Sequence, residues 1–472
     1  MSIAIDFLNN ILWSYVLIAA LLGIGLYFTF KLKFIQFRYI GEMIRVLFDK
    51  STVTDGKRSI SSFKSFCIGA ATRIGTGNLA GVAVAIGLGG PGAIFWMWLV
   101  ALLGGATSFV ESTLAQVYKV KDKYSYRGGP AYYLQKGLNM RWLGIIFAVL
   151  IAVTFGLIFN SVQSNTISFA FENAFGINRF VVGIVLSVLT AAIIFGGVQR
   201  IANFSATVVP LMAAVFVILS LVVVLTNLSA LPAVFKLIIG SAFGFEEAFG
   251  GAIGAAIMNG VKRGLFSNEA GMGSAPNAAA TATVSHPAKQ GFIQTLGVFF
   301  DTIIICTATA FIILLSDVYQ SGNVEGIQLL QNSLDTHIGG WASIFIAVSI
   351  FLFAFSSIIG SYYYGETNLE FIKKNYLSLF IFRLATIGMV MFGSLASLGL
   401  VWSLADLFMA LMTLINLFAV AMLSKVAIKV LKDYQSQRKL GKEPTFDPQK
   451  LGIDNAECWE EEDAEKKKEM VV

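Results

Sequence analysis

The 472-residue chain is 56% hydrophobic and only 13% charged, with a mean hydropathy of +0.74. Soluble domains carry about a quarter charged residues, so this composition indicates a polytopic membrane protein. Its three cysteines (Cys67, Cys306 and Cys458) lie far apart, and both histidines fall outside the long apolar runs. These residues predict neither disulfides nor a zinc or haem site, and we attribute the net charge of +6 to membrane orientation rather than to nucleic acid.

Apolar runs of about 20 residues predict eleven membrane-spanning helices. Asp6 precedes the first run and no cleavage-site pattern follows it, so we expect a retained helix rather than a signal peptide. The predicted spans lie near residues 9–30, 63–89, 92–118, 141–171, 179–198, 202–226, 236–262, 290–315, 340–364, 377–396 and 400–425.

Basic residues fall on alternate loops of this map. Segments 31–64, 119–141, 262–289, 373–383 and the tail from Lys425 carry eight, six, three, three and ten Lys or Arg residues, respectively. The opposite loops hold only Arg179 and Lys236, and the acidic connection 316–339 holds neither Lys nor Arg. Because basic loops stay cytoplasmic, we expect the N-terminus outside and the C-terminus in the cytoplasm.

The stretch GTGNLA, Gly75–Ala80, satisfies the G-x-G-x-x-G/A pattern of a dinucleotide-binding loop. Such a loop needs a preceding strand, a following amphipathic helix and an acid about 20 residues further on. Here the flanks are membrane-helix sequence, and no Asp or Glu occurs between Asp55 and Glu111. The pattern therefore predicts no nucleotide site, and its second match, GLGGPG at 87–92, is typical of a turn between two helices.

The glycines of GTGN instead predict a break in the second span. Counted from Phe63, they lie about 15 to 20 Å into the bilayer, near its middle. Gly, Thr and Asn have low helix propensity, and a break exposes backbone groups that bind a carboxylate or Na⁺. Close packing between helices is the alternative use of such glycines.

A similar stretch, FGGAIG at 249–254, lies about 15 residues into the seventh span. Spans two and seven enter the membrane from opposite sides, so each opens a five-helix unit of an inverted repeat. We therefore predict an all-α fold with a 5+5 inverted-repeat core, discontinuous helices and one extra N-terminal helix. The predicted regions are 1–62 (extra helix and basic loop), 63–226 and 227–425 (the two repeats) and 426–472 (a solvated, charged cytoplasmic tail, with a membrane-surface role for its basic part as the alternative).

Four stretches carry a resemblance to the alanine or glycine:cation symporters, which share the superfold of the bacterial leucine transporter. They are ATRIGTGNLAGVAVAIGLGGPGAIFWMW (71–98), YRGGPAYYLQKGL (126–138), FGGVQRIANFSATVVP (195–210) and GLFSNEAGMGSAPNAAATA (264–282). The resemblance implies Na⁺-coupled uptake of alanine or glycine by alternating access in a prokaryotic plasma membrane. It implies Na⁺ as the coupling ion, no other cofactor, no enzymatic activity and no obligate protein partner.

The resemblance also implies a set of binding residues. The backbone of Thr76 and Gly77 would hold the amino acid's carboxylate, with Asn78 beside substrate or ion. The side-chain pocket and the ammonium site would be formed by Phe249, Gly250, Gly251 and Ile253, a small set that suits alanine. On the fourth span, Gln163 and Ser164 either line the pathway or form hydrogen bonds between helices.

A sodium site is implied between the first break and the ninth span. Its ligands would be the carbonyl groups of Ala71, Ile74 and Phe353 and the hydroxyl groups of Ser356 and Ser357. Hard oxygen ligands of this kind suit Na⁺ without a carboxylate. The alternative is that the two serines only bond back to their own helix.

Arg73 stands near the membrane midplane, where an unpaired guanidinium is costly. We expect it to pair with Glu246, Glu247, Glu269 or Asp301 and, as a fixed cation, to favour a single coupled Na⁺. The main alternative is proton coupling through Glu246, Glu247 or Asp301. An intramembrane enzyme is disfavoured because the chain has no HExxH or GxSxG motif, and two broken helices favour a binding site over a channel.

Overall fold

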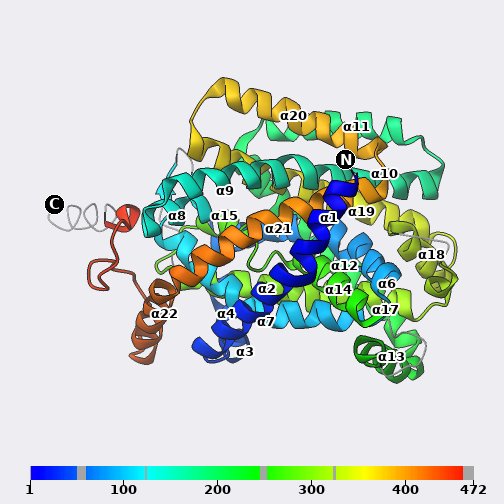
Figure 1. Cartoon of the computed structure of the whole chain (residues 1–472), viewed down its shortest axis with the longest axis horizontal. Coiled ribbons are helices and arrows are strands. Elements are labelled where there is room, and N and C mark those ends of the chain that lie inside the picture. Colours follow the sequence, from blue (N-terminus) through cyan, green and yellow to red (C-terminus); the bar gives the residue numbers. More distant parts are fainter. Residues whose placement is uncertain (1, 50–59, 123–124, 245–251, 323–325, 461–472) are drawn as a thin grey trace.

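The computed structural model describes residues 2–49, 60–122, 125–244, 252–322 and 326–460 (Figure 1). Nearly all regular structure in these residues is helical. One short antiparallel sheet, β1 (Val120–Lys121) with β2 (Tyr126–Arg127), completes the described part of the chain. The predicted all-α class is therefore confirmed.

The first half of the chain contains the elements that build the predicted first repeat and the extra helix. They are α1 (Ser2–Ile11), the π-helical turn η1 (Leu12–Val16), α2 (Leu17–Lys31), α3 (Ile35–Arg38), α4 (Ile40–Leu47), α5 (Ser62–Arg73), the π-helical η2 (Gly77–Gly81), α6 (Val82–Gly89), α7 (Ala93–Val117), α8 (Pro130–Leu138), α9 (Arg141–Val153), the π-helical η3 (Thr154–Phe159), α10 (Asn160–Phe175), α11 (Arg179–Ile194) and α12 (Gly197–Thr226).

The second half contains the remaining helices. They are the 3₁₀ turn η4 (Leu228–Ala230), α13 (Leu231–Phe243), α14 (Ala252–Asn268), α15 (Ala275–Ala280), α16 (Ala288–Val298), the π-helical η5 (Phe299–Cys306), α17 (Thr307–Leu314), the 3₁₀ turn η6 (Val318–Ser321), α18 (Ile327–Ile338), α19 (Ala342–Ile372), α20 (Tyr376–Leu395), α21 (Leu398–Met422) and α22 (Ser424–Lys439).

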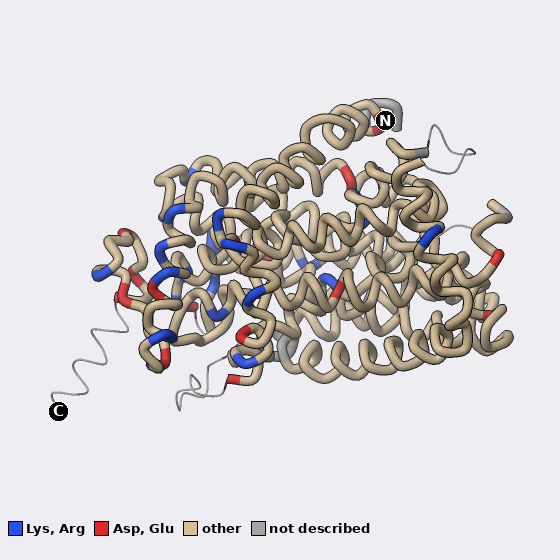
Figure 2. Tube along the Cα trace, turned by 90° about the horizontal axis from the view of Figure 1, so that it is seen from below, with Lys and Arg blue, Asp and Glu red and all other residues tan. Residues whose placement is uncertain are grey.

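Eight helices among the described residues are long and apolar enough to cross a membrane. Three shorter apolar helices accompany them, at Gly77–Gly89, Arg179–Ile194 and Leu228–Phe243. This pattern confirms a polytopic membrane protein, whereas the count of eleven spans and the repeat architecture stay predictions. Figure 2 shows Lys and Arg gathered toward the end of the molecule that carries the C-terminus.

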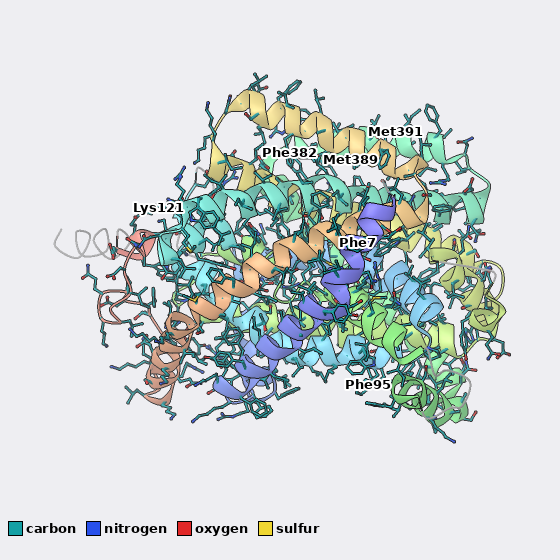
Figure 3. All side chains as sticks on the ribbon, in the orientation of Figure 1. Phe7, Phe95, Lys121, Phe382, Met389 and Met391 are labelled. Atoms are coloured by element: carbon teal, nitrogen blue, oxygen red, sulfur yellow. The ribbon has the colours of Figure 1, made fainter. Side chains whose placement is uncertain are left out.

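Two glycines on neighbouring helices allow α20 to pack closely against them. Phe382 of α20 (Figure 3) lies over Gly156 of η3 and Gly365 of α19. A Cβ at either glycine would overlap the Phe382 ring. Small residues let membrane helices approach in this way, and here they admit a large aromatic ring between three helices.

The predicted break in the second span is present. Helix α5 ends at Arg73, Ile74 leaves helical geometry with ψ 86°, and the π-helical η2 begins at Gly77. The side chains of Thr76 and Asn78 are completely buried. Freed backbone groups therefore lie inside the protein, where they need partners from other elements.

An unwound segment that faces α5 in the second half lies after Asn268. Helix α14 ends there, and Glu269, Gly271 and Gly273 all have positive φ (58°, 85° and 85°) before α15 begins. A Cβ on Gly77 would lie 3.1 Å from Ser267 Cα, so the two broken segments touch. The span predicted at 236–262 thus ends too early, since α14 continues to Asn268, while the first residues of the predicted break at 249–254 lie outside the described part.

Buried charges explain why the predicted end came too early. Lys262 and Arg263, counted above as cytoplasmic loop residues, are buried in the middle of α14. Arg263 Nη2 lies 2.5 Å from Asp406 Oδ1, and Lys262 Nζ lies 3.6 Å from Asp406 Oδ2. Both charges are compensated by one carboxylate of α21, so they do not mark the end of the span.

The C-terminal segment after Lys425 is packed against the molecule. Tyr434 is fully buried, and Phe446 and Trp459 are each 4% exposed. Trp459 Nε1 donates a hydrogen bond to the carbonyl oxygen of Gln116, 2.9 Å away. The expectation of a solvated tail is therefore wrong for this segment, because its scattered apolar residues are buried; residues 461–472 lie outside the described part.

Candidate functional site

The break between α5 and η2 exposes two backbone N–H groups to side-chain acceptors. Gly75 N–H donates to Asn78 Oδ1 at 3.0 Å, and Thr76 N–H donates to Gln163 Oε1 at 3.0 Å. The hydroxyl oxygen of Thr76 is buried and has no hydrogen-bond partner in the described part of the chain. Both N–H groups thus donate to neutral side-chain oxygens. A ligand carboxylate can replace these oxygens as the acceptor.

Asn78 links this break to a buried carboxylate. Its Nδ2 donates to Asp301 Oδ1 at 2.6 Å, and Ser267 Oγ donates to Asp301 Oδ2 at 2.7 Å. Thr302 Oγ1 adds a third hydrogen bond to Asp301 Oδ2 at 2.9 Å. Asp301 is fully buried, so these donors replace the water that the carboxylate would otherwise bind.

An aromatic wall borders the break. Phe266 lies between two rings, with centroid distances of 4.5 Å to Phe159 and 4.8 Å to Trp402. A Cβ on Gly77 would come within 3.0 Å of the Phe266 ring. Phe266 and Ser267 were not predicted as site residues, although they belong to the stretch 264–282 on which the resemblance depends.

Of the four predicted pocket residues from the seventh span, the structure describes only Ile253, and it lies away from the break. Phe249, Gly250 and Gly251 lie outside the described residues. Ile253 packs on Gly244 at the start of α14, about 20 Å along the helix from Phe266. The predicted span ended at 262, before Phe266, because the buried charges of α14 resembled a helix end.

The fourth span divides its polar side chains between two neighbours. Gln163 faces the break, as described above, whereas Ser164 is directed toward Gly393 of α20, where an added Cβ would overlap its Oγ. Asn165 Nδ2 donates to the Gly393 and Ala396 carbonyl oxygens, each at 2.8 Å. Asn165 thus bonds to a neighbouring helix, whereas Ser164 Oγ donates to the Ser161 carbonyl oxygen of its own helix at 3.2 Å. Of these three residues, only Gln163 reaches the broken helix.

A cluster of oxygens lies where α5 meets α19. Ser357 Oγ donates to the carbonyl oxygens of Ala71 (2.7 Å) and Phe353 (3.1 Å), and Ser356 Oγ donates to Phe353 at 2.8 Å. Four of the five predicted sodium ligands are thus brought together, and Ile74 follows directly at the end of α5. The structure describes no group of three or more His, Cys, Asp or Glu side chains that could hold a metal, so an ion here would rely on hydroxyl and carbonyl oxygens.

Gly75 joins the oxygen cluster to the exposed N–H groups. A Cβ at this position would overlap Ser357 Oγ and come within 3.1 Å of Gln163 Oε1. Only a residue without a side chain lets the broken backbone approach both groups. The two halves of the candidate site are therefore separated by a single residue.

Arg73 is 2% exposed and forms no ion pair with Glu269 or Asp301, the two predicted partners that the structure describes. Its three guanidinium nitrogens have no hydrogen-bond partner among the residues that the structure describes, and Nη1 lies against Gly297. Glu246 and Glu247 lie outside the described residues, so pairing with them stays a prediction.

Glu111 of α7 holds the second break in place. Its carboxylate accepts hydrogen bonds from the N–H groups of Gly271 (3.0 Å) and Gly273 (3.2 Å) and from Asn416 Nδ2 (2.7 Å). This buried carboxylate satisfies the backbone of the unwound segment 269–274, which has lost its helical acceptors. Sequence reasoning missed it because its partners come from α21 and from a loop 160 residues away.

Replacing Glu111 with alanine should lower the thermal stability of the purified protein. The change leaves three buried donors without an acceptor, each costing about 1–3 kcal/mol. The midpoint of unfolding in detergent would measure this loss, with exposed Glu172→Ala as the control. An unchanged midpoint for Glu111→Ala would contradict the proposed anchoring.

Comparison with known proteins gives the family. The sequence pattern of the sodium:alanine symporter family matches residues 1–448. The chain belongs to this family. The symporter is 59% identical to the amino-acid carrier protein AlsT of Bacillus subtilis over 97% of each chain. It is 56% identical to the probable sodium/glutamine symporter GlnT of the same organism, over 96% of this chain and 94% of that protein.

A more distant relative comes from an archaeon. The sodium/alanine symporter AgcS of Methanococcus maripaludis is 37% identical, over 92% of this chain and 97% of that one. Among solved structures, the Eremococcus coleocola manganese transporter shares the fold, with a TM-score of 0.52 and 13% identity over 87% of each chain. The symporter is therefore a multi-pass plasma-membrane transporter and not an enzyme, as expected from its sequence.

Proposed function

We propose that the symporter couples Na⁺ influx to uptake of a small neutral amino acid, alanine or glycine, by alternating access. The observation that carries this proposal is the junction at Gly75, where buried backbone N–H groups adjoin a cluster of hydroxyl and carbonyl oxygens. One side suits a carboxylate and the other a small cation, as a zwitterion–Na⁺ symport requires. The names of AgcS and GlnT, which include sodium, support the same coupling.

The substrate would lie against the break. Its carboxylate would displace Gln163 and Asn78 as acceptors for the N–H groups of Thr76 and Gly75, and the Thr76 hydroxyl would add a donor. The rings of Phe266 and Trp402 would limit the space for the side chain. A small pocket distinguishes methyl from longer side chains by about 1–3 kcal/mol per methylene, which suits alanine or glycine.

The bound Na⁺ would occupy the cluster between α5 and α19. Its ligands would be the carbonyl oxygens of Ala71, Ile74 and Phe353 with the hydroxyl oxygens of Ser356 and Ser357. Binding would draw the end of α5 toward α19, since ligands come from both helices. Ion binding would thereby fix the N–H groups at Gly75 and Thr76 for the substrate, which provides the coupling.

The site's burial supports alternating access. Thr76, Asn78 and Ser357 are completely buried, so substrate reaches them only when helices separate on one side or the other. The distribution of basic residues supports an external N-terminus and a cytoplasmic C-terminus. Inward-directed transport follows the Na⁺ gradient in this orientation.

Uptake of labelled alanine into proteoliposomes tests the function. With Na⁺, K⁺ and pH gradients imposed in turn, only the Na⁺ gradient should drive accumulation. Excess unlabelled glycine should compete, and excess unlabelled glutamine should compete weakly. Alanine accumulation that does not depend on the Na⁺ gradient would contradict the proposal.

Replacing Ser357 with alanine should raise the Na⁺ concentration needed for half-maximal uptake by about tenfold or more, because the ion loses a hydroxyl ligand. The Na⁺ dependence of initial alanine uptake measures this shift. Ser220→Ala is the matched control, since Ser220 is also buried but donates only to the Phe216 carbonyl oxygen of its own helix. Equal Na⁺ dependence in both variants would remove Ser357 from the site.

Proton coupling through Asp301 is the second candidate. It is favoured by the direct contact of this buried carboxylate with Asn78 and Ser267, next to the break. A proton on Asp301 would turn one of its carboxylate oxygens into a donor, so that this oxygen no longer accepts a hydrogen bond from Asn78 or Ser267. Because Asn78 also holds the Gly75 N–H, the change would reach the substrate site. In that case a pH gradient alone drives alanine accumulation.

A further inference from the structure

The C-terminal segment 424–460 lies across the predicted cytoplasmic end of the symporter. Helix α22 is anchored by Tyr434, whose hydroxyl donates to Glu42 Oε1 of α4 at 2.5 Å. The last part is anchored by Trp459 on α7, as described above, and Lys119 Nζ lies 4.3 Å from the centroid of the Trp459 ring. The segment is therefore fixed at both ends to different helices.

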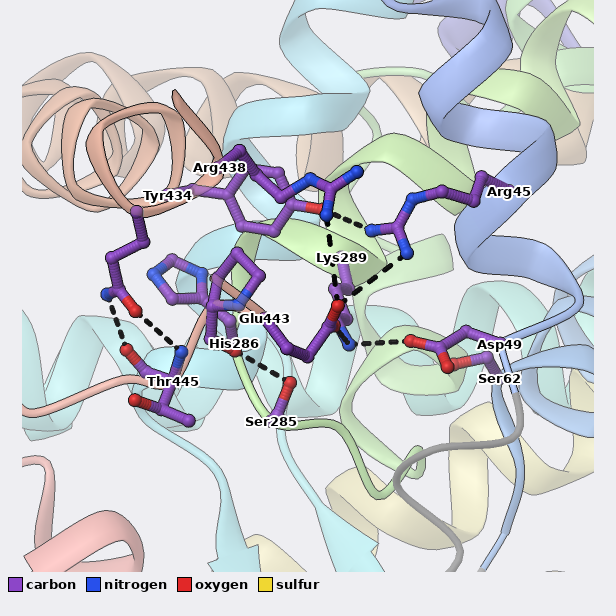
Figure 4. Close-up of polar contacts among 12 residues, drawn as sticks. Arg45, Asp49, Ser62, Ser285, His286, Lys289, Tyr434, Arg438, Glu443 and Thr445 are labelled. Carbon is purple, nitrogen blue, oxygen red and sulfur yellow. Dashed lines mark hydrogen bonds and ion pairs between the residues drawn. The ribbon is translucent and has the colours of Figure 1, made fainter. Parts of the chain in front are cut away.

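Between these anchors, residues 443–446 hold the connection that precedes α16 (Figure 4). Glu443 Oε1 lies 2.5 Å from Lys289 Nζ. Ser285 Oγ donates to the Pro444 carbonyl oxygen at 2.8 Å, and Phe446 N–H donates to the Ser285 carbonyl oxygen at 3.0 Å. One ion pair and two hydrogen bonds thus join the tail to residues 285–289.

Further cations gather around the same tail carboxylate. Glu443 Oε2 lies 3.7 Å from Arg45 Nη1 and 3.9 Å from Arg438 Nη1. Beside it, His286 is fully buried, with Nε2 at 3.2 Å from Asp433 Oδ2 of α22. Glu443 is therefore the point at which α4, α22 and the connection before α16 are held together.

The connection 281–289 in turn holds the start of α5. Thr283 N–H donates to the Ile60 carbonyl oxygen at 3.0 Å, and Gln290 Nε2 donates to Ser62 Oγ at 3.4 Å. One turn further, Ser65 Oγ donates to the Ala278 carbonyl oxygen of α15 at 2.8 Å. A continuous chain of contacts thus runs from the tail to the broken helix that carries the candidate site.

We propose that segment 424–460 is a strap that holds the N-terminal end of α5 against α15 and α16, and so sets how readily the site opens at that end. The strap is anchored at both ends, and between its anchors it contacts the connection before α16. Among the described residues, this is the only connection that donates a hydrogen bond to the Ile60 carbonyl oxygen. Separation of α5 from α15 breaks the Ser65–Ala278 bond and strains the connection that the strap holds. Loosening the strap therefore favours the open state. This inference rests on the proposed alternating-access function.

The test is the reactivity of a thiol introduced by Ser65→Cys, which is buried between α5 and α15 in the closed state. A water-soluble maleimide is applied to the cytoplasmic face of membrane vesicles, and modification is quantified by peptide mass spectrometry, which separates this thiol from native Cys67. Glu443→Gln should raise the labelling rate by about fivefold, as expected for loss of a partly exposed ion-pair cluster. Lys442→Gln, its exposed neighbour, should leave the rate unchanged.

A second variant, Phe446→Ala, should raise the rate further, because it removes a ring whose centroid lies 5.6 Å from that of His286 and 5.1 Å from that of Trp459. A chain ending at Gly441 should do the same, because it removes the contacts to Ser285 as well. Unchanged labelling in Glu443→Gln and Phe446→Ala overturns the strap, whatever the truncated chain does. Alanine uptake by the protein with its native Ser65 is measured in parallel. Labelling differences with no Na⁺-driven uptake would count against the proposed function and not against the strap.

Discussion

The Gly75→Ala variant should lose Na⁺-driven alanine uptake almost completely, by about 100-fold, while remaining folded. The added methyl group would overlap Ser357 Oγ and press on Gln163. It would therefore displace the sodium cluster and the N–H groups of the break together, and displacements of about 1 Å in a site of this kind cost about 100-fold in activity. Initial uptake in proteoliposomes, normalised to reconstituted protein, measures the effect.

The matched control for this substitution lies in the same broken helix. Gly87 of α6 is exposed, and an added Cβ would meet nothing within 4 Å. Gly87→Ala should keep normal uptake and gain slight stability, since alanine is favoured over glycine in a helix by about 1 kcal/mol. Normal uptake by Gly75→Ala would mean that the close approach to Ser357 has no part in transport.

The second large effect is expected at Asp301. Asp301→Ala would leave the donors of Asn78, Ser267 and Thr302 without their buried acceptor. We expect uptake to fall by about 30-fold or more, because Asn78 then no longer holds the Gly75 N–H in place. Asp317→Asn, an exposed acid in the connection before η6, is the control.

Asp301→Asn separates the two coupling mechanisms. The amide keeps one acceptor oxygen but carries no titratable proton. Under Na⁺ coupling, this variant should retain Na⁺-dependent uptake with weakened substrate affinity and an unchanged response to pH gradients. Loss of a pH-driven component that the unmodified protein displays would instead favour proton coupling.

The first broken helix was predictable because its signal is local. Two glycines around Thr76, followed by Asn78 in the middle of an apolar run, weaken the helix wherever it packs. The end of the seventh span was placed too early because the charges of Lys262 and Arg263 gave the hydropathy of a loop, whereas helix α14 continues to Asn268. Their compensation by Asp406, more than 140 residues away, leaves no local trace in the sequence.

The C-terminal segment is a second case in which the local sequence was misleading. Its charges predicted solvation, yet Glu443, Asp433 and Glu457 have partners on other elements, and its aromatic residues are buried. Burial of three separated side chains, Tyr434, Phe446 and Trp459, depends on a surface that the rest of the chain creates. The spacing of apolar residues within the tail does not predict that surface.

The sequence by itself therefore determined the membrane class, the helical fold, the break at GTGN and, through its resemblance, the family. These properties depend on local hydropathy, on local helix propensity or on extended motifs. Each of these can be recognised in the sequence without knowledge of the tertiary contacts. Only the tertiary structure decided which groups meet at the break: Gln163 rather than Ser164, Phe266 and Ser267 rather than Ile253, and an Arg73 without a direct ion pair in the described residues. Those pairings depend on helix rotation and register across hundreds of residues, which packing sets and a single sequence does not encode locally.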